Sequence, residues 1–383
     1  MTASMQSEAL TSPRVNPWVD AIHAYVPGKA KTADGRPAIK LSANENPFGP
    51  PPAAIAAMAA TLPDAHRYPD GSAAALRTAI AAAYDLEADR LIFGCGSDEV
   101  LQFAATAFAG PGDEVLMTQF AFSVYPIAAR RVGATPVVVP ERDYTADVDA
   151  LLAAVTPQTR MIFLANPNNP TGTVLPRTEI VRLAAHLPLR VLLVHDSAYA
   201  EYLAGDPDYT DGIDLARAAP NILVTRTFSK IHGLGGARVG WGYGPAPVIA
   251  AMDKVRGPFN LTTDAMAGAV AALADTAHAD RSRTHNLQWR GWLASELAGL
   301  GNHGIRVIPS AANFLMLEFP ETGPLTASAA FEALMAAGYI TRWLVPQGMD
   351  RNLRISIGTG AETRGVAAAL RAFVDEAGID CTA

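Results

Sequence analysis

Between residues 46 and 255, short apolar runs alternate with longer stretches of mixed polarity. The runs are brief and apolar throughout, as in strands buried on both faces of a parallel sheet, and they lie at 90–94, 114–118, 136–139, 161–165, 191–195 and 222–226. The stretches between them predict helices over 97–108, 122–131, 147–155 and 177–186. Such alternation indicates an α/β domain with a mainly parallel sheet between two layers of helices.

From about residue 256 onward the pattern changes. It predicts a long helical stretch over 264–300, strands at 305–308, 314–319 and 352–357, and helices over 328–337 and 362–376. We interpret 46–255 as a large domain and 256–383 as a smaller α+β domain that follows it in the sequence. The segment 1–45 is punctuated by proline and glycine, and we expect it to pack on the small domain or on a partner subunit.

Composition narrows the class of protein. Half of the 383 residues are hydrophobic and 17% are charged, which is typical of a globular chain. The net charge of −7 argues against a large nucleic-acid interface, because phosphate backbones are bound by basic surfaces. Cys95 and Cys381 are far apart, and no paired Cys or His spacing predicts a metal site. There is no signal-peptide pattern around Glu8 and no apolar run of ~18 residues, so we expect a cytoplasmic protein without a membrane partner.

The first chemical motif is the turn 94–99 (GCGSDE), between a predicted strand and a predicted helix. Gly96 allows a tight turn, and Ser97 and Asp98 open the helix, where free backbone N–H groups suit an anion such as phosphate. Taken alone, the motif fits an ordinary helix start equally well.

The second motif, 166–172 (NPNNPTG), directly follows a predicted strand. Its prolines fix the backbone, so that Asn169 can offer its amide at the carboxyl end of the strand, where ligands bind in open α/β sheets. A rigid turn without a ligand is the alternative, because Asn, Pro and Gly are common turn residues.

The third motif is 191–199 (VLLVHDSAY), in which Asp196 closes an apolar strand. An aspartate there can cap the next helix, or it can pair with a cationic ring nitrogen and keep a pyridinium protonated. Tyr199 lies within reach of the same place. His195 alternates to the other face of the strand, and we interpret it as a core histidine and not as a ligand.

The fourth motif is 225–238 (TRTFSKIHGLGGAR). Lys230 follows a strand end with the hydroxyl residues Thr227 and Ser229, and it precedes a glycine-rich turn. A lysine amine that is desolvated or placed near positive charge becomes an uncharged nucleophile. Arg238 supplies a permanent cation for a phosphate. A lone lysine is usually a solvated surface residue, but this setting favours a chemical role.

Together these motifs resemble those of fold-type-I pyridoxal-phosphate enzymes, and within them those of the histidinol-phosphate aminotransferase family. The segments 41–50 (LSANENPFGP), 66–70 (HRYPD) and 353–359 (LRISIGT) resemble further motifs of that family. The similarity extends from about Tyr25 to Arg364. It implies an aspartate-aminotransferase-like fold with a mainly parallel seven-stranded sheet, and pyridoxal 5'-phosphate as cofactor.

The resemblance also implies roles for single residues. Lys230 carries the cofactor as a Schiff base, Asp196 binds the pyridine nitrogen, and Asn169 and Tyr199 hold the ring oxygen. Phe122 stacks on the ring, at a position where the family often has tyrosine. The implied phosphate cup consists of Gly96, Ser97, Asp98, Thr227, Ser229 and Arg238.

Substrate and partner residues are implied in the same way. Tyr68 matches a residue that reaches the cofactor phosphate of the other subunit, which implies a homodimer with shared sites. Tyr25, Asn44, Arg342 and Arg354 match residues near the substrate. As a lone arginine, Arg342 fits a solvated surface position equally well. The paired arginines favour a phosphate, because a phosphate offers more acceptor oxygens and more charge than a carboxylate.

The implied reaction is a ping-pong transfer of an amino group from histidinol phosphate to 2-oxoglutarate, which becomes glutamate, in histidine biosynthesis. In this reaction the freed Lys230 amine moves the α-proton of the donor. An aromatic-amino-acid or prephenate aminotransferase is the nearest alternative, followed by a phosphothreonine decarboxylase. A non-enzymatic regulator would need a DNA-binding extension, and no basic helix-turn-helix segment precedes residue 40.

Overall fold

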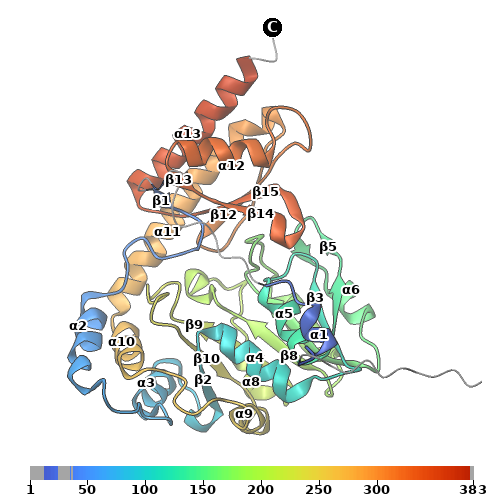
Figure 1. Ribbon diagram of the computed structural model, residues 1–383, viewed down its shortest axis with the longest axis vertical. Helices are drawn as coiled ribbons and strands as arrows, with labels where there is room; N and C mark the ends of the chain where they lie inside the picture. Colours follow the sequence, from blue (N-terminus) through green and yellow to red (C-terminus); the bar gives the residue numbers. More distant parts are fainter. Residues whose placement is uncertain (1–12, 25–34, 36–37, 380–383) are drawn as a thin grey trace, which may run out of the picture.

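The computed structural model describes residues 13–24, 35 and 38–379, which form a large sheet with its helices and a smaller sheet beside it (Figure 1). The large sheet contains β2 (Leu91–Cys95), β3 (Glu114–Thr118), β4 (Thr135–Val139), β7 (Thr159–Ala165), β8 (Leu192–Asp196), β9 (Ile222–Thr227) and β10 (Val239–Tyr243). The strand order of this seven-stranded sheet is β2-β10-β9-β8-β7-β3-β4. Only β10 runs antiparallel to its neighbours, so the mainly parallel α/β fold is confirmed.

Helices cover both faces of this sheet, which explains why its strands are apolar throughout. In β7, Met161 and Phe163 pack on one face, whereas Ile162 and Leu164 pack on the other. The first face is covered by α4 (Ser97–Phe108), α5 (Val124–Arg131) and α9 (Ala246–Asp253). The second face is covered by α3 (Ala74–Tyr84), α6 (Val148–Ala153), α7 (Arg177–His186), α8 (Ile213–Ala218) and α10 (Thr263–Ala274).

Strand β10 is absent from the sequence prediction. Its sequence, VGWGY, alternates large residues with glycine, and glycine is a poor strand former. Packing explains the glycines. A Cβ at Gly240 would lie 2.1 Å from the backbone nitrogen of Ser97, and one at Gly242 would lie 2.9 Å from the Val100 side chain. The glycines therefore let β10 approach the turn that precedes α4.

The smaller sheet has four antiparallel strands in the order β11-β12-β15-β14. These are β11 (Arg306–Ile308), β12 (Phe314–Glu318), β14 (Arg342–Leu344) and β15 (Met349–Ser356), packed against α11 (Thr276–Leu297), α12 (Ala327–Ala336) and α13 (Gly360–Ile379). The early strand β1 (Ile39–Lys40) pairs in parallel with β13 (Tyr339–Ile340) beside this sheet. The described elements also include α1 (Pro17–Asp20), α2 (Pro52–Ala60), β5 (Glu141–Arg142) and β6 (Thr145–Ala146).

The single helical stretch predicted over 264–300 is wrong in one respect, because two helices occupy it. The backbone leaves the helical region at Asp275, where ψ is 72°, and the Asp275 side chain accepts a hydrogen bond from the His278 nitrogen to cap α11. Helix α10 packs on α2 and α3, whereas α11 extends towards the small sheet (Figure 1).

The domain boundaries at 45 and 255 stay a prediction. No helix within the described ranges has the length and apolar character needed to cross a membrane.

Candidate active site

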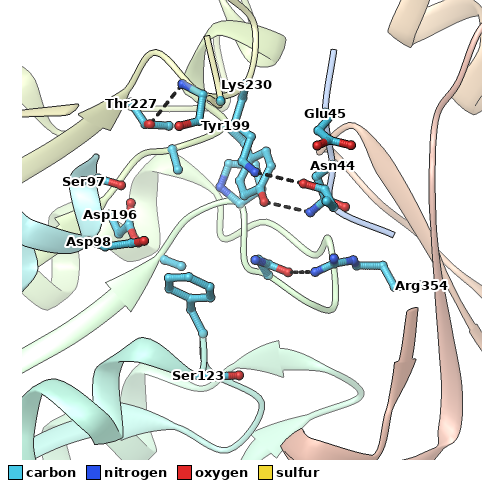
Figure 2. A pocket seen from close by; sticks show the side chains of 18 of the residues that line it. Asn44, Glu45, Ser97, Asp98, Ser123, Asp196, Tyr199, Thr227, Lys230 and Arg354 are labelled. Atoms are coloured by element: carbon cyan, nitrogen blue, oxygen red, sulfur yellow. Dashed lines mark hydrogen bonds between the residues drawn. The ribbon is translucent and has the colours of Figure 1, made fainter. Parts of the chain in front are cut away.

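A cavity of about 300 Å³ lies at the carboxyl ends of β7, β8 and β9, facing the small sheet (Figure 2). Parallel strands that end at one edge place their following residues together there, so motifs distant in sequence meet. Most of the predicted site residues line this cavity, namely Asn44, Ser97, Asp98, Phe122, Asn169, Asp196, Tyr199, Thr227, Ser229, Lys230, Arg238, Arg342 and Arg354.

One end of the cavity is built to hold an anion. Gly96 has a φ of 79° and precedes α4, so the first N–H groups of that helix point out of its N-terminus. A Cβ at Gly96 would lie only 2.3 Å from Nη2 of Arg238, so glycine is needed for the guanidinium to reach this turn. Arg238 donates from Nη1 to Ser229 Oγ (3.2 Å), and its Nη2 lies 3.5 Å from Asp98 Oδ2.

Asp196 lines the cavity and is buried. Its Oδ2 accepts a hydrogen bond from the Tyr125 hydroxyl (2.8 Å), and its Oδ1 accepts one from Thr225 Oγ1 (3.1 Å). Burial raises the pKa of Asp196 to about 6, whereas the two hydroxyl donors lower it. His195 points to the opposite face and is buried near the Asp211 carbonyl, as predicted for a core histidine.

Lys230 follows β9 and projects into the same cavity (Figure 2). Its Nζ donates to the Ala43 carbonyl at 3.3 Å and lies 5.8 Å from the centroid of the Tyr199 ring. Burial, followed by the positive charge of Arg354, lowers the pKa of Lys230 to about 8. An amine with this pKa loses its proton readily and can act as a nucleophile or as a general base.

Two polar side chains have their orientation fixed by neighbours from distant segments. Asn44 Nδ2 donates to the Tyr199 hydroxyl (2.9 Å), so the Tyr199 proton is directed to another acceptor. Arg354 donates to Oδ1 of Asn169, which turns the Asn169 amide nitrogen away from the arginine. The Tyr199 hydroxyl and the Asn169 amide nitrogen are therefore each left to donate into the cavity. Burial raises the pKa of Tyr199 to about 12, so its hydroxyl keeps the proton at neutral pH.

Arg342 and Arg354 form the wall opposite the large sheet. They are direct cross-strand partners on β14 and β15, and both side chains are buried. Arg354 also donates from Nη2 to the Ser42 carbonyl (2.7 Å), which ties the small sheet to the segment containing Asn44. The interpretation of Arg342 as a solvated surface residue is wrong, because it lines the cavity beside Arg354.

Several cavity residues are missing from the sequence prediction, among them Glu45, Ser123, Tyr125 and Gln347. Tyr125 is the most consequential, because its hydroxyl contacts Asp196 directly. The available signal was its spacing, since Tyr125 lies one helical turn after Phe122. An aromatic residue at that spacing is typical of a helix core, and the pattern did not distinguish the two roles.

Of the predicted residues that the structure describes, Tyr68 lies away from the cavity. Tyr68 is 84% exposed on the outside of the large domain, where its ring stacks on Phe259 with a centroid distance of 4.9 Å. It does not line the cavity of its own chain. Tyr25 lies outside the described residues.

Comparisons with known proteins agree with this geometry. The family described as aminotransferase class I and II matches residues 36–372. The chain is 58% identical to histidinol-phosphate aminotransferase from Sphingopyxis alaskensis over 93% of this chain and 96% of that protein. It is 52% identical to the protein of the same name from Zymomonas mobilis over 96% and 99% of the two chains.

Among solved structures, histidinol-phosphate aminotransferase from Sinorhizobium meliloti in complex with pyridoxal-5'-phosphate superposes with a TM-score of 0.85. It is 28% identical and covers 96% of this chain and 99% of its own. A mutant aspartate aminotransferase from Thermus thermophilus, 24% identical over 95% of this chain and 100% of its own, shares the fold with a TM-score of 0.81.

The cavity fits the cofactor of this family. Its anion cup around Gly96 suits a phosphate, its buried Asp196 suits a protonated ring nitrogen, and its half-buried Lys230 suits covalent attachment of an aldehyde. The cofactor is pyridoxal 5'-phosphate. The chain thus belongs to the histidinol-phosphate aminotransferase family, within aminotransferase class I and II, and is a pyridoxal-phosphate-dependent aminotransferase.

Proposed function

We propose that this enzyme transfers the amino group of histidinol phosphate to 2-oxoglutarate, yielding glutamate, as a step of histidine biosynthesis in the cytoplasm. The observation that carries the choice of donor is the pair of buried arginines, Arg342 and Arg354, which face the cavity together. Two guanidinium groups match the charge and the several oxygens of a phosphate better than those of a carboxylate. The names of the relatives at 58% and 52% identity support the same donor.

The residues divide the work as follows. Bound pyridoxal phosphate supplies a ring that withdraws electrons from the α-carbon of the donor. Asp196 holds the proton at the ring nitrogen, and Asn169 and Tyr199 donate hydrogen bonds to the ring oxygen. Lys230 Nζ attaches the cofactor between turnovers. As a free amine, Lys230 would accept the α-proton of the donor and later give that proton back.

Other residues hold the cofactor phosphate and the anionic end of the substrate. The turn at Gly96, together with Ser97, Asp98, Thr227, Ser229 and Arg238, holds the cofactor phosphate, and Phe122 stacks on the ring. Arg354 holds the anionic end of either substrate from across the cavity, and Arg342 adds a second cation for a phosphate. Asn44 keeps the Tyr199 hydroxyl in place through its 2.9 Å hydrogen bond.

The choice of donor is tested by turnover with 2-oxoglutarate as acceptor. Histidinol phosphate is expected to have a higher kcat/KM than phenylalanine or tyrosine. A higher kcat/KM for an aromatic donor would overturn the proposed substrate and leave the aminotransferase assignment intact.

Arg342→Ala tests the phosphate argument directly. We expect it to reduce kcat/KM for histidinol phosphate by roughly 10- to 100-fold, which corresponds to a charged hydrogen bond worth about 1.5–3 kcal/mol. Phenylalanine and tyrosine should lose less than about threefold, because they present no phosphate. Arg354→Ala should impair all donors, because each presents an anion to that residue.

Arg351→Ala is the matched control. Arg351 also belongs to β15, but it lies at an odd spacing from Arg354 and pairs with Glu318 outside the cavity. It should leave the selectivity unchanged. Equal losses for all three donors in Arg342→Ala would contradict a phosphate-specific role of that arginine.

We also propose that the chain forms a homodimer with shared sites. Tyr68 and Phe259 expose a stacked aromatic pair near the exposed Leu62, and this surface is separate from the cavity of the same chain. Exposed apolar groups gathered in this way are typical of a protein interface. In such a dimer, Tyr68 of each subunit reaches the cofactor phosphate of the other.

Mixing two inactive variants tests the dimer. Lys230→Ala keeps Tyr68 and Tyr68→Phe keeps Lys230, so a hybrid dimer contains one intact site. At limiting cofactor, random reassociation should restore about a quarter of wild-type activity, since half of the dimers are hybrid and each has one working site. Sedimentation at the assay concentration gives the oligomeric state. A fully active monomer would contradict shared sites.

A further inference from the structure

Tyr125 connects three parts of the candidate site through one buried side chain. It belongs to α5, and its hydroxyl donates to Oδ2 of Asp196 at 2.8 Å. Its ring stacks on Phe163 of β7 with a centroid distance of 4.8 Å and an interplanar angle of 12°. The ring also meets Phe122 edge-on, at 5.8 Å and 87°. A substitution at Tyr125 therefore alters the surroundings of both the Asp196 carboxylate and the Phe122 ring.

The hydrogen bonds around Asp196 favour one protonation state. Each carboxylate oxygen accepts a hydrogen bond from a hydroxyl group, Oδ2 from Tyr125 and Oδ1 from Thr225. An ionised carboxylate accepts both bonds, whereas a protonated one has to give up or reverse one of them. Burial and the nearby Asp98 act in the opposite direction and raise the pKa of Asp196. The hydroxyl of Tyr125 thus offsets part of the free-energy cost of keeping the Asp196 carboxylate charged in a buried site.

We propose that Tyr125 is a positioning residue for transamination, which keeps the Asp196 carboxylate ionised and aimed at the ring nitrogen of the cofactor while it supports Phe122. This inference rests on the proposed role of Asp196. Thr225 shares the carboxylate, but only Tyr125 also contacts Phe122, so it links the position of the charge to that of the stacking ring. The effect on catalysis is indirect and acts through Asp196.

Tyr125→Phe removes the hydroxyl and keeps the ring, so the contacts with Phe122 and Phe163 remain. Tyr243→Phe is the matched control, because the buried Tyr243 also donates its hydroxyl to a carboxylate, that of Glu87. Tyr243 ends the antiparallel strand β10 and pairs with Leu91, the first residue of β2. It therefore lies at the edge of the sheet opposite the cavity.

Three readouts separate positioning from packing. For Tyr125→Phe we expect a kcat lower by about 10-fold with a donor KM changed by less than about threefold, as for loss of a hydrogen bond to a charged group. The cofactor dissociation constant, measured by absorbance, should rise by about 10-fold. The pH below which the cofactor binds weakly should move upward, because the pKa of Asp196 rises without the donor. Tyr243→Phe should move none of these.

The pH readout needs the other groups near Asp196 to be constant. Asp98 from α4 and Tyr199 after β8 are the further titratable groups that interact with this carboxylate, and both variants keep them. If Tyr125→Phe fails to fold, a fluorinated tyrosine at position 125 replaces it. The more acidic hydroxyl strengthens the hydrogen bond, so the pH limit for cofactor binding should then move downward.

A double-mutant cycle with Asp196→Asn decides whether Tyr125 acts through the carboxylate. In the Asp196→Asn background, Tyr125→Phe should change the cofactor dissociation constant by less than about threefold, because the charge it serves is gone. An unchanged effect in that background, or equal effects of Tyr125→Phe and Tyr243→Phe, would overturn the inference and leave Tyr125 as a packing residue. Normal turnover of the single variant Asp196→Asn would instead refute the role proposed for Asp196.

Discussion

Replacing Lys230 with alanine is expected to lower transamination by roughly 10⁴-fold or more, because one amine serves as both covalent anchor and proton carrier. Lys230 is half-buried, desolvation lowers its pKa to about 8, and its Nζ donates a hydrogen bond to the Ala43 carbonyl at the edge of the cavity. The same variant should lose the visible absorbance that borohydride abolishes in the wild type. Borohydride reduction followed by peptide mapping is therefore the direct measurement.

The loss should not arise from unfolding. Burial lowers the pKa of Lys230 from its ordinary value of 10.5, so the charged amine costs stability in the cofactor-free protein at pH below 8. Removing that charge relieves this cost. Lys254→Ala, at the exposed end of α9, is the matched control and should keep full activity and labelling. A reduced peptide map that places the cofactor on another lysine would refute the assignment.

Much of the fold could be predicted because its strands have a simple pattern. Strands buried on both faces by helices read as continuous apolar runs, and the runs at β3 and β7 to β9 agree with the structure to within one or two residues. β10 was missed because its glycines serve a close approach to Ser97, a tertiary requirement that a local pattern does not reveal. The break at Asp275 was missed because an aspartate inside a helical pattern is common.

The candidate site could be predicted where a chemical motif follows a strand. Asp196, Lys230 and the turn at Gly96 all lie at the carboxyl ends of strands of one sheet, so their convergence follows from the α/β topology. Residues from the small sheet were harder to place from residues alone. β14 was not predicted, so only the resemblance placed Arg342 near the substrate. The register of β14 and β15 places it directly across from Arg354.

Asp196→Asn is expected to keep the fold and to lower the exchange of the donor α-proton by roughly 100-fold. Asparagine has nearly the same shape, and its Oδ1 still accepts one hydroxyl hydrogen bond, but it carries no charge to hold a proton on the ring nitrogen. A charge-assisted hydrogen bond of about 3 kcal/mol corresponds to that factor. Proton exchange of the donor in deuterated water, followed by NMR, measures this step separately from product release.

The control distinguishes chemistry from a structural role of the carboxylate. Asp147 is a largely buried aspartate that caps α6 by accepting hydrogen bonds from the nitrogens of Asp149 and Ala150. Asparagine caps helices about as well as aspartate, so Asp147→Asn should keep both fold and exchange rate. If Asp196→Asn behaves in the same way, Asp196 is a structural residue and the proton on the ring nitrogen needs another holder. A large loss in Asp196→Asn alone, with unchanged unfolding, supports the carboxylate as the group that maintains the ring charge.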